Sequence, residues 1–139
     1  MYKADNKGFT LIELLVVIAI IGLLSTVVFT SLNQARKKGR DGRRVQDINQ
    51  IRGALELYYD RQGSYPAALS SLTAQDIPVI PKDPNTNNDY GYVSSGQDYV
   101  LYATLEDSNS KALDNDIDGN VRVGSRTVNC NDPVYCVQP

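Results

Sequence analysis

The chain has 139 residues, a formal net charge of −2, no histidine, no tryptophan and two cysteines. This length suits one domain and is small for two independent cores. The absence of histidine removes the commonest general base and zinc ligand, and the sequence contains no glycine-rich phosphate loop. The composition therefore indicates that the chain is not an enzyme.

Charge is distributed unevenly along the chain. Residues 9–62 carry eight basic and five acidic side chains, whereas residues 63–139 carry four basic and ten acidic ones. A basic N-terminal half thus precedes an acidic C-terminal half, so the small net charge gives no guide to partners.

An apolar stretch begins close to the N-terminus. Residues 9–32 contain one charged side chain, Glu13, and would form about 36 Å of helix, enough to cross a bilayer. An acid inside such a span costs about 2.5–3.5 kcal/mol on insertion scales, so it calls for a functional explanation. A secretory signal peptide is cut after its apolar core, whereas the small residue Gly8 precedes the core here. Cleavage at Gly8 would leave the span in the mature protein with a new amine at its tip.

Residues 7–21, KGFTLIELLVVIAII, resemble the N-terminus of the type IV pilin and type II secretion pseudopilin family. The resemblance implies a leader over residues 1–8, which a prepilin peptidase removes by cutting between Gly8 and Phe9. It also implies N-methylation of Phe9 and a mature protein that polymerises into a helical filament.

Glu13 becomes the fifth mature residue in this comparison. The resemblance implies that it pairs with the Phe9 amine of an adjacent subunit and sets the register of assembly. The alternative, a plain single-span membrane anchor, gives Glu13 no role. Thr30 stands where family members often carry proline, so the sequence leaves open whether the helix bends there.

The resemblance further implies a location and a set of partners. We expect a single-pass protein of the cell (inner) membrane with a cytoplasmic N-terminus, which later enters a periplasmic or cell-surface filament. Its partners would be membrane lipid before assembly, the prepilin peptidase, an inner-membrane assembly platform and further copies of itself. The competing class is a binding module, such as a minor or DNA-uptake pilin.

A cluster of basic residues follows the span. Residues 35–44, ARKKGRDGRR, hold six cations against one acid. Three interpretations stay open: contact with anionic lipid headgroups, pairing with acidic residues of neighbouring subunits, and DNA binding. No aromatic side chain interleaves with these cations, so the nucleic-acid signal is weak. The positive-inside rule would place the cluster in the cytoplasm, against the orientation that the resemblance implies.

Apolar residues then recur in three- and four-residue steps, at positions 45, 48, 51, 55 and 58. This spacing predicts that the helix continues to about residue 62, where Gly63 ends it. A single helix over residues 9–62 would be about 80 Å long, more than a globule of this size encloses. We therefore predict three parts: a leader over residues 1–8, a transmembrane and assembly helix over 9–33, and a head over 34–139.

The second half predicts a small antiparallel sheet. Alternating residues and turn signals place strands over residues 90–94, 99–105, 121–123 and 127–129. Prolines at positions 78, 81 and 84 exclude a central strand between them. The fold class is therefore α+β, a long N-terminal helix packed on a small antiparallel sheet. Residues 54–66, together with the PKDP that follows, also resemble the stem-to-head junction of major type II secretion pseudopilins.

Residues 114–119, DNDIDG, match the first half of a calcium loop. The candidate ligands are Asp114, Asp116, Asp118 and Asn120, but Ser125 stands where the loop needs a bidentate carboxylate. Glu106 or Asp107 could complete the shell instead. Major type II secretion pseudopilins carry calcium in their C-terminal loops, which supports this site. The alternative is an acidic, solvated turn, and no other cofactor is expected.

Cys130 and Cys136 are the only two cysteines. An exported head lies in a compartment that permits oxidation, so we predict a disulfide between them. The disulfide favours a pilus subunit, whereas the calcium-like loop and the junction sequence favour a pseudopilin.

Overall fold

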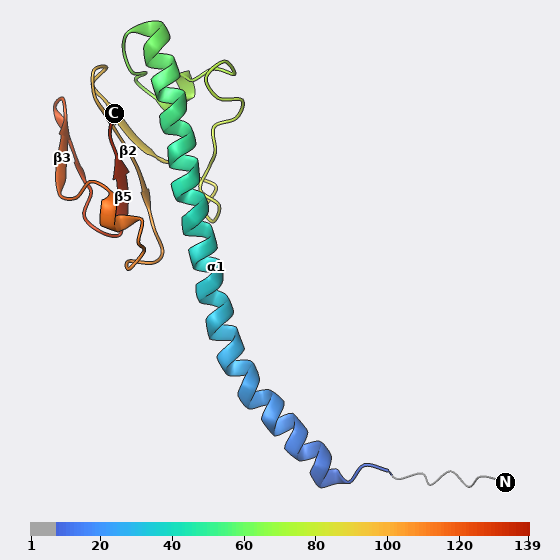
Figure 1. The fold of residues 1–139 in the computed structure, drawn as a ribbon. Helices are drawn as coiled ribbons and strands as arrows, with labels where there is room; N and C mark the ends of the chain where they lie inside the picture. Colours follow the sequence, from blue (N-terminus) through green and yellow to red (C-terminus); the bar gives the residue numbers. More distant parts are fainter. Residues whose placement is uncertain (1–7) are drawn as a thin grey trace. The chain divides into compact units, whose positions relative to one another are not determined.

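The computed structural model describes residues 8–139, so the predicted leader before Gly8 lies outside the described residues. The described residues divide into two compact units, one that ends at Arg36 and one over Lys37–Pro139. One helix, α1 (Leu11–Gln62), belongs to both units. Figure 1 shows this helix and the strands that follow it. The two units are described in turn.

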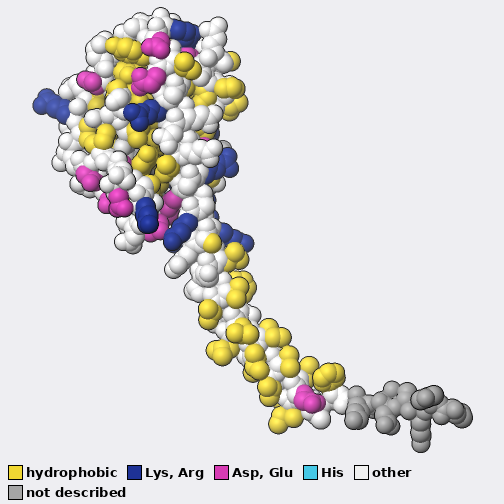
Figure 2. All heavy atoms as spheres, viewed as in Figure 1, with side chains coloured by type: hydrophobic (Ala, Val, Ile, Leu, Met, Phe, Trp, Pro, Cys, Tyr) yellow, Lys and Arg dark blue, Asp and Glu magenta, His cyan; other side chains and the backbone are white. Residues whose placement is uncertain are grey.

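The described part of the first unit is a helix that buries no large apolar side chain. From Leu11 to Leu32, all of these side chains are exposed, and Leu23 for example is 71% exposed. Figure 2 shows the apolar side chains along this stretch. The 22 residues from Leu11 to Leu32 form about 33 Å of helix, close to the 30 Å thickness of the hydrocarbon core of a bilayer. This half of α1 is thus long and apolar enough to span a membrane.

Hydroxyl side chains do not interrupt this apolar helix. Ser25, Thr26 and Thr30 donate hydrogen bonds to backbone carbonyls three or four residues earlier. Such bonds satisfy the hydroxyl groups within the helix itself. The chain is helical through Thr30, the position at which the sequence left a bend open.

The second unit contains a three-stranded antiparallel sheet in the order β1-β2-β5 and a separate two-stranded sheet, β3-β4. Four strands confirm the predicted ones to within one residue at each end. The strands are β1 (Gly91–Ser94), β2 (Tyr99–Thr104), β3 (Asn120–Val123), β4 (Arg126–Asn129) and β5 (Val134–Val137). The sequence missed β5, because its four residues do not alternate and they directly follow a proline.

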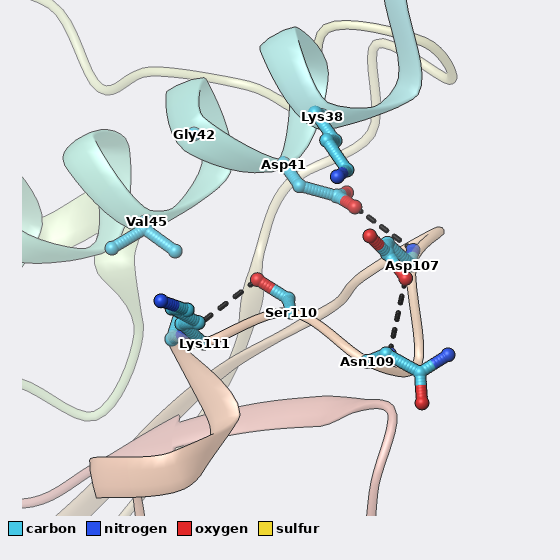
Figure 3. Close-up of a pocket in the computed structure, with 9 residues that line it drawn as sticks. Lys38, Asp41, Gly42, Val45, Asp107, Asn109, Ser110 and Lys111 are labelled. Carbon is cyan, nitrogen blue, oxygen red and sulfur yellow. Dashed lines mark hydrogen bonds between the residues drawn. The ribbon is translucent and has the colours of Figure 1, made fainter. Parts of the chain in front are cut away.

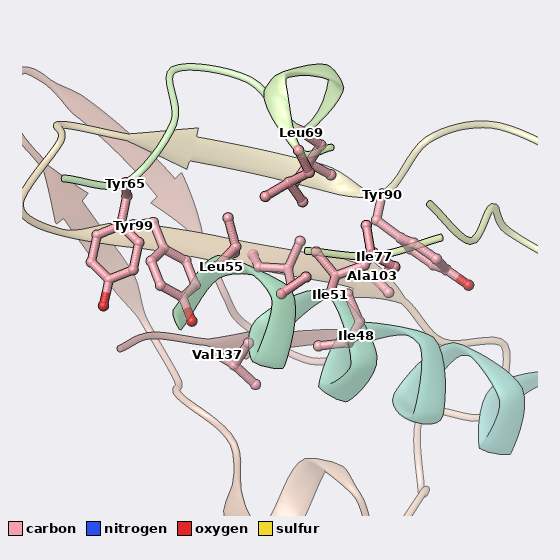
Figure 4. Packing of buried hydrophobic residues seen from close by; sticks show 13 residues of the cluster. Ile48, Ile51, Leu55, Tyr65, Leu69, Ile77, Tyr90, Tyr99, Ala103 and Val137 are labelled. Atoms are coloured by element: carbon pink, nitrogen blue, oxygen red, sulfur yellow. The ribbon is translucent and has the colours of Figure 1, made fainter. Parts of the chain in front are cut away.

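The main core lies between α1 and one face of the three-stranded sheet. Ile48, Ile51 and Leu55 of α1 are fully buried, as the helical spacing predicted. Figure 4 shows them facing Tyr99, Ala103 and Val137 of the sheet. Gly63 ends the helix with a φ of 71°, a left-handed conformation that glycine adopts at little cost. The α+β class and the helix-on-sheet packing are confirmed.

The other face of the sheet has a smaller core of its own. Val100 of β2 is fully buried there against Val123 and Val128 of the β3-β4 hairpin. The disulfide cysteines complete this cluster. No partner for this face of the sheet was predicted from the sequence. The alternation of residues in β2 shows that Val100 points to this face, but it does not show that a second sheet covers it.

Candidate processing and assembly site

The predicted cleavage site lies just before α1. Gly8 and Phe9 are not helical, and the Phe9 side chain is 91% exposed. A peptide bond in exposed, non-helical backbone is accessible to a peptidase. The geometry is therefore compatible with processing between Gly8 and Phe9.

Glu13 caps the beginning of its own helix. Its Oε2 accepts hydrogen bonds from the Thr10 N–H and from the Thr10 Oγ1, both at 2.8 Å. In return, the Glu13 N–H donates to Thr10 Oγ1 at 3.2 Å. This reciprocal arrangement is a capping box, which satisfies backbone N–H groups that have no partner inside the helix. The negative charge also lies favourably at the positive end of the helix dipole.

Thr10 is the functional residue that the sequence interpretation missed. The spacing Thr-x-x-Glu at a helix start was the available signal. From the sequence, Glu13 is predicted only as a partner for an amine, without a local role. The structure shows that Glu13 already has polar partners within the chain, which reduces the cost of holding it near an apolar environment.

The basic cluster separates into two groups with different surroundings. Arg44 is 3% exposed and lies among carboxylates of its own chain. Its side chain donates to Asp41 at 2.7 Å, Asp83 at 2.6 Å and Glu106 at 2.8 Å. Arg40 forms a bidentate pair with Glu106, at 2.7 and 2.6 Å. Two of the six cations therefore hold α1 to the segments around Asp83 and Glu106.

Two carboxylates of this network, Glu106 and Asp83, are held in their charged form. Hydrogen bonds from Arg40 and Arg44 lower the pKa of Glu106 to about 2. The Arg44 hydrogen bond likewise lowers the pKa of Asp83, and backbone N–H groups add to the effect. Asp41 also accepts the backbone N–H groups of Glu106 and Asp107. Removal of one member of such an ion-pair network is strongly destabilising, because the remaining charged groups are left without partners.

Asp47 is a second buried acid of α1. It is 7% exposed, and it accepts a hydrogen bond from the Tyr90 hydroxyl at 2.6 Å. Burial and this bond raise the pKa of Tyr90. The helix therefore buries selected acids as well as its apolar stripe, and each of these acids has a partner on the head.

The other cations of the cluster, Arg36, Lys37, Lys38 and Arg43, are exposed. None of them forms an ion pair within residues 8–139. Lys38 lines a pocket of about 440 Å³ between α1 and the loop after β2, opposite Lys111. Figure 3 shows the two lysines on the two sides of this pocket. These groups remain available to an external partner.

The predicted calcium loop brings part of its acidic set together. Carboxylate oxygens of Asp116, Asp118 and Asp132 lie within 4.8 Å of one another. Asp114 is not in this group, and Asp132, which the sequence did not single out, takes the remaining place. Glu106, an alternative ligand in the sequence, is instead bound to Arg40 and Arg44.

Asp116 is the partly buried member of the three acids. Its Oδ2 accepts the Cys136 N–H at 2.9 Å, whereas its buried Oδ1 has no hydrogen-bond partner in the described chain. Burial and the charges of Asp118 and Asp132 raise the pKa of Asp116. An oxygen without a partner beside two further carboxylates suits a hard cation such as calcium. These residues therefore fit a divalent cation.

Cys130 and Cys136 form the predicted disulfide. Both cysteines are fully buried in the smaller core. Asp132 lies inside the loop that this bond closes, so the disulfide and the acidic group share one segment of chain.

Known proteins match the chain over its N-terminal part and beyond it. The family model described as the prokaryotic N-terminal methylation motif matches residues 3–29. The type II secretion system core protein G of Escherichia coli (strain K12) is 33% identical over 103 residues, which cover 69% of this chain and 71% of that protein. The same protein of Aeromonas hydrophila is 33% identical over 94 residues, 67% of this chain and 66% of the relative.

A pilus protein matches as well. The type IV wide pilus major component PilA4 of Thermus thermophilus is 43% identical over 78 residues, which cover 54% of this chain and 60% of that protein. No solved structure matches the chain. The methylation motif, the apolar half of α1 with its capped acid, and these relatives lead to one conclusion: the chain belongs to the type IV pilin and type II secretion pseudopilin family.

Proposed function

We propose that this protein is a structural subunit of a type IV pilus or pilus-like filament, stored in the membrane and polymerised through the first half of α1. The observation that carries the proposal is the exposure of every large apolar side chain from Leu11 to Leu32. Such a surface needs lipid before assembly and other apolar helices afterwards. The relatives named as pilus and secretion-system core components support the same role.

Processing prepares the subunit for assembly. A prepilin peptidase cuts between Gly8 and Phe9, and methylation follows on the new Phe9 amine. The chain itself performs no catalysis in this scheme. The protein stays in the inner membrane with its N-terminus on the cytoplasmic side until an assembly platform extracts it.

Glu13 then sets the register between subunits. During storage its carboxylate is occupied by Thr10. In the filament, the Phe9 amine of a neighbouring subunit becomes a charged partner for this carboxylate. A charge-assisted hydrogen bond in a medium of low dielectric constant is stronger than a neutral one, so correctly aligned subunits are favoured.

Two glutamate variants separate the local role of Glu13 from its role in assembly. Glutamine at this position of a capping box can still bond to the backbone N–H but carries no charge. We expect Glu13→Gln and Glu13→Ala to insert and to be cleaved, and both to yield few sheared filaments. Normal filament yield from Glu13→Gln would refute the ion pair and leave only the capping role.

The intact mass of the membrane-derived protein tests the processing step directly. We expect a mass that lacks residues 1–8 and gains one methyl group. An unprocessed mass in cells that contain an active prepilin peptidase would contradict the proposal and support a plain membrane anchor.

A type II secretion pseudopilus is the second candidate within this function, and the acidic group favours it. Calcium would be held by Asp116, Asp118 and Asp132, whose carboxylates it would neutralise while linking two loops of the head. A ligand that binds only the folded state stabilises it by about 2.7 kcal/mol at one hundred times its Kd. We expect calcium to raise the thermal midpoint of the full chain and Asp132→Asn to abolish the increase. Identical melting curves with calcium and with a chelator would refute calcium binding.

A further inference from the structure

The division of the basic cluster leaves a specific set of cations without partners. Arg40 and Arg44 form ion pairs with carboxylates of the second unit. In the second unit, Lys37, Lys38 and Arg43 remain exposed and form no ion pair with any described residue. We call these three residues the basic ring.

The members of the basic ring point in different directions around α1. At 3.6 residues per turn, Lys38 lies about 100° from Lys37, and Arg43 lies about 140° beyond Lys38. The three side chains therefore surround the helix axis rather than forming a stripe. A protein surface or a DNA groove approaches a helix from one side and would leave part of such a ring unused. Lys37 and Lys38 lie at nearly the same depth and can contact one layer around the helix, whereas Arg43 lies about 9 Å further along it than Lys37.

The position of Lys37 and Lys38 along the chain matches such a layer. Lys37 comes five residues after Leu32, the last residue of the apolar stretch, which corresponds to about 7.5 Å of helical rise. The region between hydrocarbon and water in a bilayer is about 5–8 Å thick on each side. Lysine and arginine side chains also reach along the helix toward polar surroundings.

The pocket beside Lys38 adds a further cation to this region. Lys111 enters it from the loop after β2, as Figure 3 shows. Two acids line the same pocket, but both have donors already. Asp41 binds Arg44 and two backbone N–H groups, and the Oδ1 of Asp107 accepts the Asn109 N–H. The two lysines are thus the cationic side chains of this pocket, and they can receive an anionic group.

We propose that Lys37 and Lys38 of the basic ring, with Lys111 beside them, bind the phosphate groups of anionic phospholipids and hold the stored subunit at the membrane surface. This inference rests on membrane storage as given in the proposed function. Each lysine or arginine near an anionic surface strengthens the attraction, and the effect weakens as salt rises. Extraction into a filament would break these contacts, so the ring would also set a barrier to leaving the membrane.

Spin-labelled lipids measure this preference on the full chain. The protein is reconstituted into vesicles of phosphatidylcholine with phosphatidylglycerol, and the association of labelled phosphatidylglycerol is compared with that of labelled phosphatidylcholine. The test variant is Lys37→Gln/Lys38→Gln. The matched control is Arg122→Gln/Arg126→Gln, which removes two exposed cations from the β3-β4 hairpin and leaves the same net charge.

We expect the wild type and the control to prefer phosphatidylglycerol and the test variant to lose the preference by about fivefold for each cation removed. High salt should reduce the wild-type preference as well. Equal preferences in the test variant and the control would overturn the proposal. So would a test variant that keeps its lipid preference but loses filament yield or DNA binding, because the ring would then serve a subunit contact or a nucleic acid. Flotation with the vesicles checks membrane storage separately, since a chain that does not float refutes storage itself.

Discussion

The two halves of α1 differ in what their side chains contact. From Leu11 to Leu32 the helix exposes every large apolar residue, and the capping pair of Thr10 and Glu13 supplies its one charge-bearing contact. From Arg40 to Arg61 the helix buries apolar residues against the sheet, and its arginines bind acids of the head. The first half depends on surroundings outside the chain, whereas the second half completes its contacts within it.

This difference separates assembly from stability. Substitutions in the first half should alter insertion and polymerisation and leave the head folded. Substitutions in the second half should alter the free energy of unfolding of the head. Eight of the nine tyrosines lie between residues 58 and 135, so near-ultraviolet circular dichroism of the full chain in detergent reports on the head alone.

Arg44→Met should produce the largest loss of stability. It leaves Asp41, Asp83 and Glu106 with fewer positive partners, and breaking a buried ion pair from one side costs about 3–5 kcal/mol. Urea unfolding followed by the tyrosine signal measures the change. Arg43→Met is the matched control, because Arg43 is exposed and neighbouring, and it should change stability by less than about 0.5 kcal/mol. Equal effects of the two variants would contradict the role of the network.

Removal of the disulfide should have the next largest effect. A double Cys130→Ser/Cys136→Ser variant releases a loop closed over a sequence separation of 6 residues, which the chain-entropy model values at about 2 kcal/mol. The same urea experiment applies, and the wild type under reducing conditions should match the variant. An unchanged midpoint would show that the loop is already fixed by the small core around Val100.

Acid should weaken the head through the same network. The pKa of Glu106 is about 2 in the folded protein and about 4.3 in an unfolded chain, so the unfolded state takes up a proton first as pH falls. The free energy of unfolding should therefore decrease from about pH 4.5 toward pH 2. The lowered pKa of Asp83 acts in the same direction, whereas the raised pKa of Asp116 opposes it. Glu106→Gln, unfolded in urea over this pH range, should show a flatter profile than the wild type.

Two glycine substitutions should give the smallest effects and compare the two halves directly. Gly53 and Gly22 are both helical, and a methyl group at either would meet no other atom within 4 Å. Alanine is favoured over glycine in a helix by about 1 kcal/mol, so Gly53→Ala should stabilise the head by up to this amount. Gly22→Ala should leave unfolding of the head unchanged. A shift of the tyrosine transition by Gly22→Ala would show that the halves are not energetically separate.

Local patterns determined much of this protein. The period of the apolar residues predicted the helix to Gln62, Gly63 marked its end, and alternation predicted two strands of the main sheet. The cleavage motif and Glu13 could be recognised directly in the sequence, because they lie in one short continuous segment of the chain. The disulfide followed from there being two cysteines on an exported chain.

Only the tertiary structure decided how the charged residues are used. Arg40 and Arg44 look the same in sequence as Lys37, Lys38 and Arg43, yet the first two face acids that lie 39 to 66 residues away along the chain. Asp132 joins Asp116 and Asp118 for the same reason, since folding brings a distant loop beside them. Helical periodicity depends on neighbours three or four residues apart and can be read from sequence, whereas the partner of a charge depends on the packing of the whole head.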